Sequence, residues 1–239
     1  MGMYVLDSDR FARTRMLIGD KALDKLKNSR VLLFGLGGVG SYTAEAIARA
    51  GVGNISLVDS DTVAPSNLNR QLCALESTVG RYKTDVVAER IMQINPGCNV
   101  TVFTEFYLPG SDIVDFTAYD YVADAIDTVK AKLDIAEKCI NSGVPVISCM
   151  GTGNKLDPSL FRVSDISKTE VCPLCKVIRY ELRKRGINHL NVVWSPENPI
   201  KPAPCDDNNN GRTPASISFV PGAAGLIMAG KIITDLCKE

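Results

Sequence analysis

A net charge and an amino-terminal apolar run are both missing from this sequence of 239 residues. Its 27 basic residues are balanced by 27 acidic ones, so no global positive field attracts nucleic acid or an anionic membrane, and a polyanion would need a local basic patch. The chain opens with MGMYVLDSDRFARTR, which lacks the apolar centre of a secretory signal. We therefore expect a cytoplasmic protein.

Long apolar stretches and closely spaced cysteines are also scarce. The most apolar late segment, residues 223–236, is interrupted by Lys231 and Asp235 and is shorter than the roughly 20 residues that a membrane span needs. We expect a core helix there and no membrane span. The eight cysteines are scattered along the chain, which favours reduced, mostly buried thiols over a disulfide scaffold.

Histidine occurs once, as His189, shortly after Gly186 in a predicted turn. Imidazole suits proton transfer near neutral pH, but this position supports no Ser-His-Asp arrangement. We expect His189 to be structural or exposed.

What the sequence does contain is an alternation of short apolar strands and helices. Strands are predicted at residues 30–35, 54–59, 99–105, 119–126 and 145–149, and helices at 39–50, 83–95 and 129–141. This order predicts an α/β fold with a doubly wound, mainly parallel, Rossmann-like sheet. We expect about five strands, within the usual range.

The pattern changes after Gly151, where we expect a smaller carboxyl-terminal lobe. GTGNKLDPSLF predicts a hairpin that turns at residues 157–159, followed by a helix at 173–185. A long surface loop without regular structure is expected at 196–214, and a final helix from about residue 223. We divide the chain into an arm and helix (1–28), a nucleotide-binding domain (29–151) and a substrate-facing lobe (152–239).

A glycine-rich turn, GLGGVG, joins the first strand to the first helix and contains Gly35, Gly37, Gly38 and Gly40. Glycines let backbone N–H groups approach a phosphate, and the amino end of a helix favours negative charge. Asp59 ends the second strand, where a carboxylate accepts hydrogen bonds from ribose hydroxyls. Together these features predict a nucleotide, and alone they fit a nicotinamide dinucleotide equally well.

The residues after Asp59 favour a nucleoside triphosphate. Polar side chains follow the carboxyl end of the second strand, where doubly wound sheets bind ligands: Asp61, Asn67, Asn69, Arg70 and Gln71. Lys83 begins the next predicted helix. Arg70 and Lys83 would neutralise a triphosphate and stabilise charge on departing pyrophosphate.

Two aspartates in YVADAIDT, Asp124 and Asp127, lie at the end of the fourth predicted strand. Asp127 is placed to reach a Mg²⁺ ion that bridges phosphate oxygens. For a single aspartate, a helix cap or a turn is the commoner role.

The motifs GLGGVG, VDSDTV, SNLNRQ, VGRYKTDVVAERI, INP and DAID, in this order and spacing, resemble those of the ThiF/MoeB-type adenylating enzymes, which are related to ubiquitin-activating enzymes. The resemblance covers residues 10–151. It implies ATP-dependent formation of an acyl-adenylate, with nucleotide and metal roles for Gly37, Asp59, Asn67, Arg70, Lys83 and Asp127.

The same resemblance implies a homodimer. RFART at residues 10–14 resembles the family's amino-terminal arginine segment, in which Arg13 would reach the ATP of the other subunit. Without the resemblance, Arg10, Arg13 and Arg15 would be interpreted as a solvated basic face.

The carboxyl-terminal part resembles a narrower branch, the tRNA threonylcarbamoyladenosine dehydratases, through VSDISKTEVCPL, KVIRYELRKRGI and NVVWSPENP. This resemblance implies adenylation of the threonyl carboxylate on a modified adenosine, then closure to a cyclic hydantoin with release of AMP. The basic helix would contact tRNA phosphates through Lys176, Arg179, Arg183, Lys184 and Arg185. Without this resemblance, the charged side of that helix would be interpreted as an ordinary solvent-exposed face.

Two alternatives remain open at this point. A sulfur-carrier activator would adenylate a small ubiquitin-like protein, but such enzymes usually hold zinc with two CxxC pairs. Cys172 and Cys175 form the only such pair here, and Cys205 and Cys237 lack ligand spacing, so zinc is not expected. The second alternative, a nucleotide-binding regulatory protein without turnover, is disfavoured by the intact Arg70, Lys83 and Asp127. A chemical role for Cys149, Cys172 or Cys175 stays open.

Overall fold

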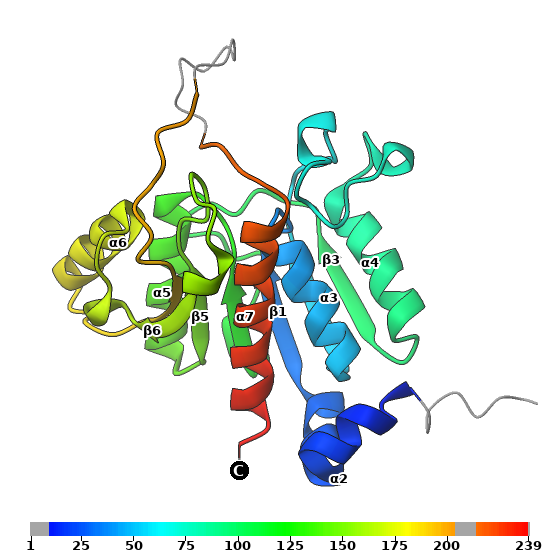
Figure 1. Ribbon diagram of the computed structural model, residues 1–239. Helices are drawn as coiled ribbons and strands as arrows, with labels where there is room; N and C mark the ends of the chain where they lie inside the picture. Colours follow the sequence, from blue (N-terminus) through cyan, green and yellow to red (C-terminus); the bar gives the residue numbers. More distant parts are fainter. Residues whose placement is uncertain (1–9, 204–213, 239) are drawn as a thin grey trace, which may run out of the picture.

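The computed structural model describes residues 10–203 and 214–238. These residues form a seven-stranded sheet with helices on both faces (Figure 1). The strands are β1 (Arg30–Phe34), β2 (Asn54–Val58), β3 (Asn99–Phe103), β4 (Tyr121–Asp124), β5 (Val146–Cys149), β6 (Arg162–Asp165) and β7 (Asn191–Trp194). Their order across the sheet is β3-β2-β1-β4-β5-β7-β6, and only β6 runs antiparallel to its neighbour.

The predicted doubly wound, mainly parallel sheet is therefore confirmed. Phe34 at the end of β1 lies opposite Val58 of β2 on one side and Asp124 of β4 on the other. The strand order changes direction between β1 and β4, which is where open α/β sheets form a ligand crevice.

Both faces of the sheet are covered because the central strands are apolar on both sides. Val31 and Leu33 of β1 pack in one core with α3 (Gly40–Ala50), α4 (Lys83–Ile94) and α7 (Phe219–Leu236). Leu32 and Phe34 pack in the other core with α5 (Val129–Ser142) and α6 (Pro173–Lys184). Continuous burial of this kind is typical of parallel strands.

The part after residue 151 extends the same sheet. The predicted hairpin at 151–161 is wrong: no strand precedes the turn, and β6 instead pairs antiparallel with β7. The turn itself forms, because the Asp157 carboxylate accepts a hydrogen bond from the Ser159 N–H at 2.9 Å. Five strands are thus formed by residues up to 149 and two more by later residues, so the estimate of about five was too low.

Helix α7 begins at Phe219 rather than near residue 223. Pro221 and Gly222 suggest a turn from sequence, but proline is tolerated in the first turn of a helix, where its missing N–H would have no partner. By length and composition alone α7 could cross a membrane, yet half of it is buried inside the protein. It is a core helix, as expected.

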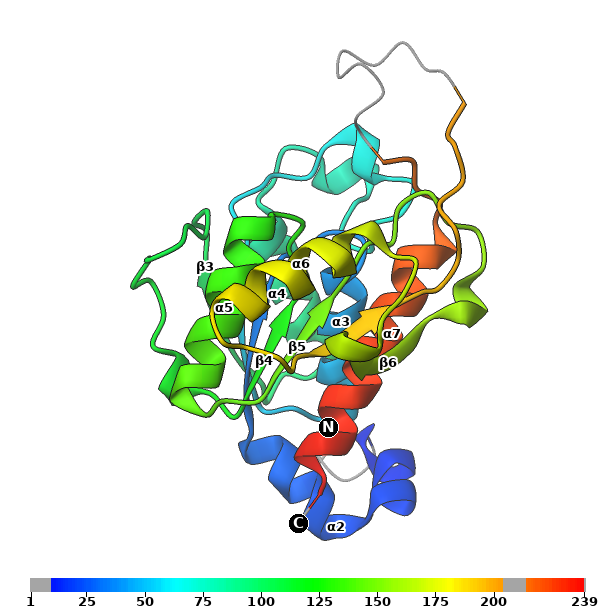
Figure 2. The same cartoon turned by 90° about the vertical axis from the view of Figure 1, so that its left-hand side faces the viewer.

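Helix α2 (Ala12–Asn28) bends at Gly19 and lies at the end of the sheet opposite the loops that follow β2 (Figures 1 and 2). Within the predicted loop at 196–214, residues 196–203 have no regular structure. Residues 204–213, and Cys205 with them, lie outside the described residues.

Candidate functional site

A cavity of about 800 Å³ opens at the carboxyl ends of the parallel strands. Most residues selected from the sequence line it: Gly35, Gly37, Gly38, Asp59, Asp61, Asn67, Arg70, Gln71, Lys83 and Asp127. Among the residues predicted for catalysis or nucleotide binding, three do not line it, namely Gly40, Asn69 and Arg13, and the five predicted tRNA-binding residues lie outside it as well. The volume is within the range of small-molecule sites.

The glycine turn is compact because two of its backbone segments nearly touch. A Cβ atom on Gly40 would lie 1.8 Å from the carbonyl oxygen of Gly35, so no larger residue fits without moving the turn. Gly40 therefore shapes the turn at the start of α3 without lining the cavity, while Gly37 and Gly38 lie on the wall.

Asp59 is held in one orientation at the end of β2. One carboxylate oxygen accepts a hydrogen bond from the Leu36 N–H at 2.6 Å, and the other accepts one from the Asp61 N–H at 2.8 Å. Burial raises the pKa of Asp59, and the positive charge of Lys83 opposes that shift. The carboxylate is thus tied to the glycine turn and retains acceptor capacity toward the cavity.

Lys83 supplies a buried positive charge at the start of α4. Its side chain is 6% exposed, and its Nζ lies 2.7 Å from Asp61 Oδ2. An ammonium group has three donors, and this contact uses one of them. Asp61 therefore balances the cation and leaves it able to bind an anion in the cavity.

Arg70 is held by its own segment. Its guanidinium donates hydrogen bonds to the Ser66 carbonyl at 2.8 Å and to Asn69 Oδ1 at 2.9 Å. The Asn69 amide in turn donates to the Ser216 carbonyl at 3.1 Å. Asn69 thus supports the arginine and joins two cavity-forming segments instead of lining the cavity.

The two aspartates at and after the carboxyl end of β4, Asp124 and Asp127, have different environments. Asp127 is exposed on the cavity wall, with one long contact to the Thr128 hydroxyl at 3.4 Å. Asp124 is 1% exposed, does not line the cavity, and lies 3.0 Å from Lys132 Nζ. Asp127 is therefore the carboxylate that a ligand can reach.

Lys132 was not predicted as a site residue. Its Nζ is equally buried, and it also donates hydrogen bonds to Ser148 Oγ at 3.1 Å and to the Cys149 carbonyl at 2.7 Å. This network fixes the carboxyl ends of β4 and β5 to each other. A lysine inside VKAKLD looks like a surface residue in the sequence, so no signal identified it.

Lys155 was also missed. It lines the cavity, is only 5% exposed, and donates one hydrogen bond to the Glu197 carbonyl at 2.6 Å. The Glu197 carboxylate accepts hydrogen bonds from the Leu156 and Asp157 N–H groups. The sequence pattern predicts a hairpin for GNKLDP, which gives no reason to expect a buried lysine there.

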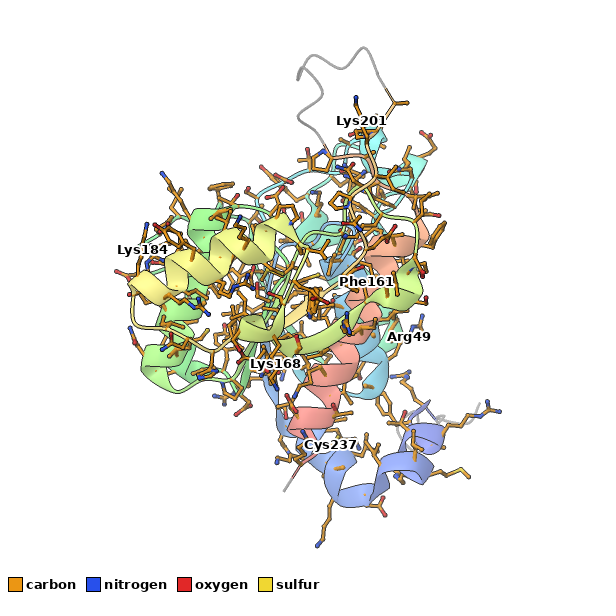
Figure 3. All side chains as sticks on the ribbon, turned by 60° about the vertical axis from the view of Figure 1, so that its left-hand side comes forward. Arg49, Phe161, Lys168, Lys184, Lys201 and Cys237 are labelled. Atoms are coloured by element: carbon orange, nitrogen blue, oxygen red, sulfur yellow. The ribbon has the colours of Figure 1, made fainter. Side chains whose placement is uncertain are left out.

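The predicted basic helix places its cations unequally. Lys176 and Arg183 are exposed, whereas the half-buried Arg179 donates hydrogen bonds to the Ile166 and Thr169 carbonyls at 3.1 and 2.8 Å. Lys184 is exposed at the outer end of α6 (Figure 3) and pairs with Glu181, and Arg185 lies 3.7 Å from Glu137. Arg179 therefore fixes the loop before α6 and does not share the exposed face, contrary to the sequence expectation.

Arg13 lies on α2, at the opposite end of the sheet from the cavity, and is exposed. It cannot reach the cavity of its own chain in this arrangement. Among the described residues, no group of three or more histidine, cysteine or acidic side chains is placed to hold a metal ion.

The chain matches the ThiF family over residues 11–239 and belongs to that family. Within it, the chain is similar to the tRNA threonylcarbamoyladenosine dehydratase of Bacillus subtilis, with 44% identity over 96% of this chain and 95% of that protein. The enzyme of the same name from Escherichia coli is 42% identical over 76% of this chain and 69% of its own length.

A solved structure supports the same grouping. The Escherichia coli tRNA N6-threonylcarbamoyladenosine dehydratase in complex with ATP superimposes with a TM-score of 0.86 at 33% identity, covering 99% of this chain and 97% of that one. By contrast, the adenylyltransferase and sulfurtransferase UBA4 of Vanderwaltozyma polyspora is 39% identical over only 55% of this chain and 30% of its own length. The comparisons favour the dehydratases over the sulfur-carrier activators.

Proposed function

We propose that this protein is an ATP-dependent tRNA threonylcarbamoyladenosine dehydratase that acts in the cytoplasm. The observation that carries the proposal is the cavity in which Arg70, Lys83 and Asp127 meet the glycine turn, in a chain that matches such an enzyme over nearly its whole length. ATP would bind with its ribose at Asp59 and its phosphates on the Gly37 turn.

The chemistry follows from the charges around the cavity. A threonyl carboxylate oxygen attacks the α-phosphorus of ATP, and pyrophosphate leaves. Arg70 and Lys83 stabilise the negative charge that develops on the departing group. A urea nitrogen of the same side chain then attacks the activated acyl carbon, loses its proton and displaces AMP. Ring closure within one substrate needs orientation more than a protein nucleophile.

We propose that Mg²⁺ accompanies the ATP. In nucleotide sites this ion is usually held by one or two carboxylates together with substrate phosphates. Asp127 fits that role because its exposed carboxylate lines the cavity with few competing hydrogen bonds. The ion would screen phosphate charge, while Arg70 and Lys83 orient the same oxygens.

Lys155 extends this proposal to the second substrate. It faces the cavity from the segment after β5, and Lys83 faces it from the start of α4. A buried cation separate from the triphosphate cations would attract the substrate carboxylate and orient it for attack.

The test is an assay on modified tRNA. Purified protein, ATP, Mg²⁺ and tRNA bearing threonylcarbamoyladenosine are incubated, and the nucleosides are analysed by mass spectrometry. We expect a hydantoin nucleoside lighter by one water, together with AMP. An unchanged nucleoside, from protein that still binds ATP, would contradict the assignment.

A further inference from the structure

Two cysteines meet at the amino end of α6, beside the nucleotide cavity. Cys172 immediately precedes the helix, and Cys175 lies in its first turn. They are 3% and 1% exposed. Cys172 also lines the cavity, whereas Cys175 is packed behind it in the core on the α6 side. The pair is thus buried in the protein but open to the cavity on one side.

The environment of the pair favours one thiolate. The neighbouring Cys175 thiol, and after it the N–H groups of Cys175, Gly151 and Leu174, lower the pKa of Cys172, although burial opposes that shift. The same thiol–thiol contact raises the pKa of Cys175, which keeps its proton. Free N–H groups at a helix start stabilise a thiolate in this way.

The remaining described cysteines behave differently. Burial raises the pKa of Cys73, Cys98, Cys139, Cys149 and Cys237. A buried thiol of raised pKa is unreactive. Packing alone therefore accounts for those cysteines, but it does not account for two thiols paired at a helix start on a cavity wall.

We propose that Cys172 and Cys175 form a redox-active dithiol that reacts with low-molecular-weight disulfides entering from the nucleotide cavity. The Cys172 thiolate attacks one sulfur of the disulfide, forming a mixed disulfide and releasing one thiolate. Cys175 then loses its proton and attacks the Cys172 sulfur, which releases the second thiolate. Two electrons pass from the protein dithiol to the small disulfide, and both released thiolates leave as thiols after protonation.

The spacing suits closure of the pair. Side chains three residues apart at a helix start lie on the same face, with Cβ atoms about 5–6 Å apart. A small relaxation of the first turn brings them within the range of a protein disulfide. The Gly151 N–H helps to lower the pKa of Cys172, so closure, which removes the thiolate, would also affect the segment that leads to Lys155.

The first experiment uses the unmodified full chain and oxidised glutathione. After reaction, free thiols are alkylated and the protein is digested with trypsin, which releases residues 169–176 as one peptide containing both cysteines. We expect this peptide to be two hydrogens lighter than its reduced form and to carry no alkyl group. Recovery of the peptide with two alkyl groups, from folded protein, would overturn the proposal.

Two substitutions assign the order of attack. Cys175→Ser should trap glutathione on Cys172, and Cys172→Ser should leave Cys175 unmodified. Cys237→Ser is the matched control, since Cys237 lies at the far end of α7 (Figure 3), and it should form the internal disulfide at the original rate. Glutathione on Cys175 in Cys172→Ser, at the rate of the unmodified chain, would overturn the assignment of the attacking sulfur.

Access and metal content are tested separately, without tRNA. ATP at ten times its Kd should slow the reaction about tenfold, because only roughly a tenth of the sites remain free. An unchanged rate would contradict entry through the cavity, and tightly bound zinc at the pair in the purified protein would contradict a free dithiol. Because no dehydration is measured, a failure here is distinguishable from a failure of the proposed function.

Discussion

Some charged side chains in this protein are buried together with an oppositely charged partner, whereas others are exposed to solvent. Lys132 and Asp124 form an ion pair with both side chains 1% exposed. Removing one partner of such a pair leaves an uncompensated buried charge, which costs about 3–5 kcal/mol. We therefore expect Lys132→Met to lower the free energy of unfolding by about that amount, as measured by urea denaturation.

The neighbouring Lys130 supplies the control, since it is exposed on the same helix. Lys130→Met should change the free energy of unfolding by less than about 0.5 kcal/mol. Adding Asp124→Asn to Lys132→Met should restore part of the loss, because the orphaned charge is then removed. Equal stability of the two lysine variants would contradict a structural role for Lys132.

A substitution of Arg70 tests the proposed adenylation chemistry. Arg70→Ala should lower kcat for hydantoin formation by about a hundredfold or more, since the departing pyrophosphate loses a charged donor. Arg81→Ala is a suitable control, because Arg81 is exposed, pairs with Glu89 and does not line the cavity. Similar kcat values for both variants, measured by nucleoside mass spectrometry, would remove Arg70 from the proposed machinery.

The sequence identified the site residues that lie in motifs and missed two buried lysines that do not. Asp59, Arg70 and Lys83 follow strand ends or begin a helix, so their positions could be inferred from local pattern. Lys132 and Lys155 become visible only through long-range packing, because each is buried by segments remote in the sequence. Local periodicity carries no information about such contacts.

At the scale of elements, the closest helix packing is between α3 and α7. A Cβ atom on Gly225 would lie 2.4 Å from the Val39 carbonyl oxygen, and the Thr43 hydroxyl donates to the Gly225 carbonyl at 3.1 Å. Gly225→Ala should therefore force the helices apart and lower the free energy of unfolding by about 1–3 kcal/mol. Thermal or urea unfolding measures the change.

Gly230 in the same helix has open space around it. Gly230→Ala should stabilise the protein by about 0.5–1 kcal/mol, because alanine loses less backbone entropy in a helix. If the free energy of unfolding falls in Gly225→Ala and rises in Gly230→Ala, the result supports close packing of α3 against α7 at Gly225. A loss of stability in both would point to a helix-wide effect instead.

The positions of strands and helices before residue 150 could be predicted because the two kinds of element alternate there and turn residues separate them. Later elements were harder. Strand β6 pairs antiparallel with β7, which follows only after α6, and a local sequence pattern does not reveal such a pairing. Pro221 and Gly222 concealed the first turn of α7. In both regions tertiary pairing, rather than local preference, decides the structure.

For the whole molecule, the exposed cations of α6 provide a test of tRNA binding. The double variant Lys176→Glu/Arg183→Glu should raise the KM for tRNA roughly tenfold at moderate salt and weaken its salt dependence, because fewer phosphate contacts remain. Its Kd for ATP should not change. Lys21→Glu on α2 is the control, and an equal rise in KM there would indicate a nonspecific charge effect.

The proposed homodimer makes a complementation prediction. Arg13→Ala and Arg70→Ala should each be inactive if Arg13 completes the site of the other subunit. Mixing the two variants under conditions of subunit exchange should restore activity, because one site of each mixed dimer then has both arginines. Absence of recovery, with exchange verified by mass spectrometry, would exclude the shared site.

Helix α7 also constrains how the protein is made. It packs against α3 and contacts β4, β5, β6 and β7, and its Pro221 lies on the cavity wall beside Gly38. The glycine turn emerges from the ribosome long before that wall can be completed. A nascent chain therefore exposes its central sheet until α7 docks, and nucleotide binding reports completed synthesis rather than an early folding step.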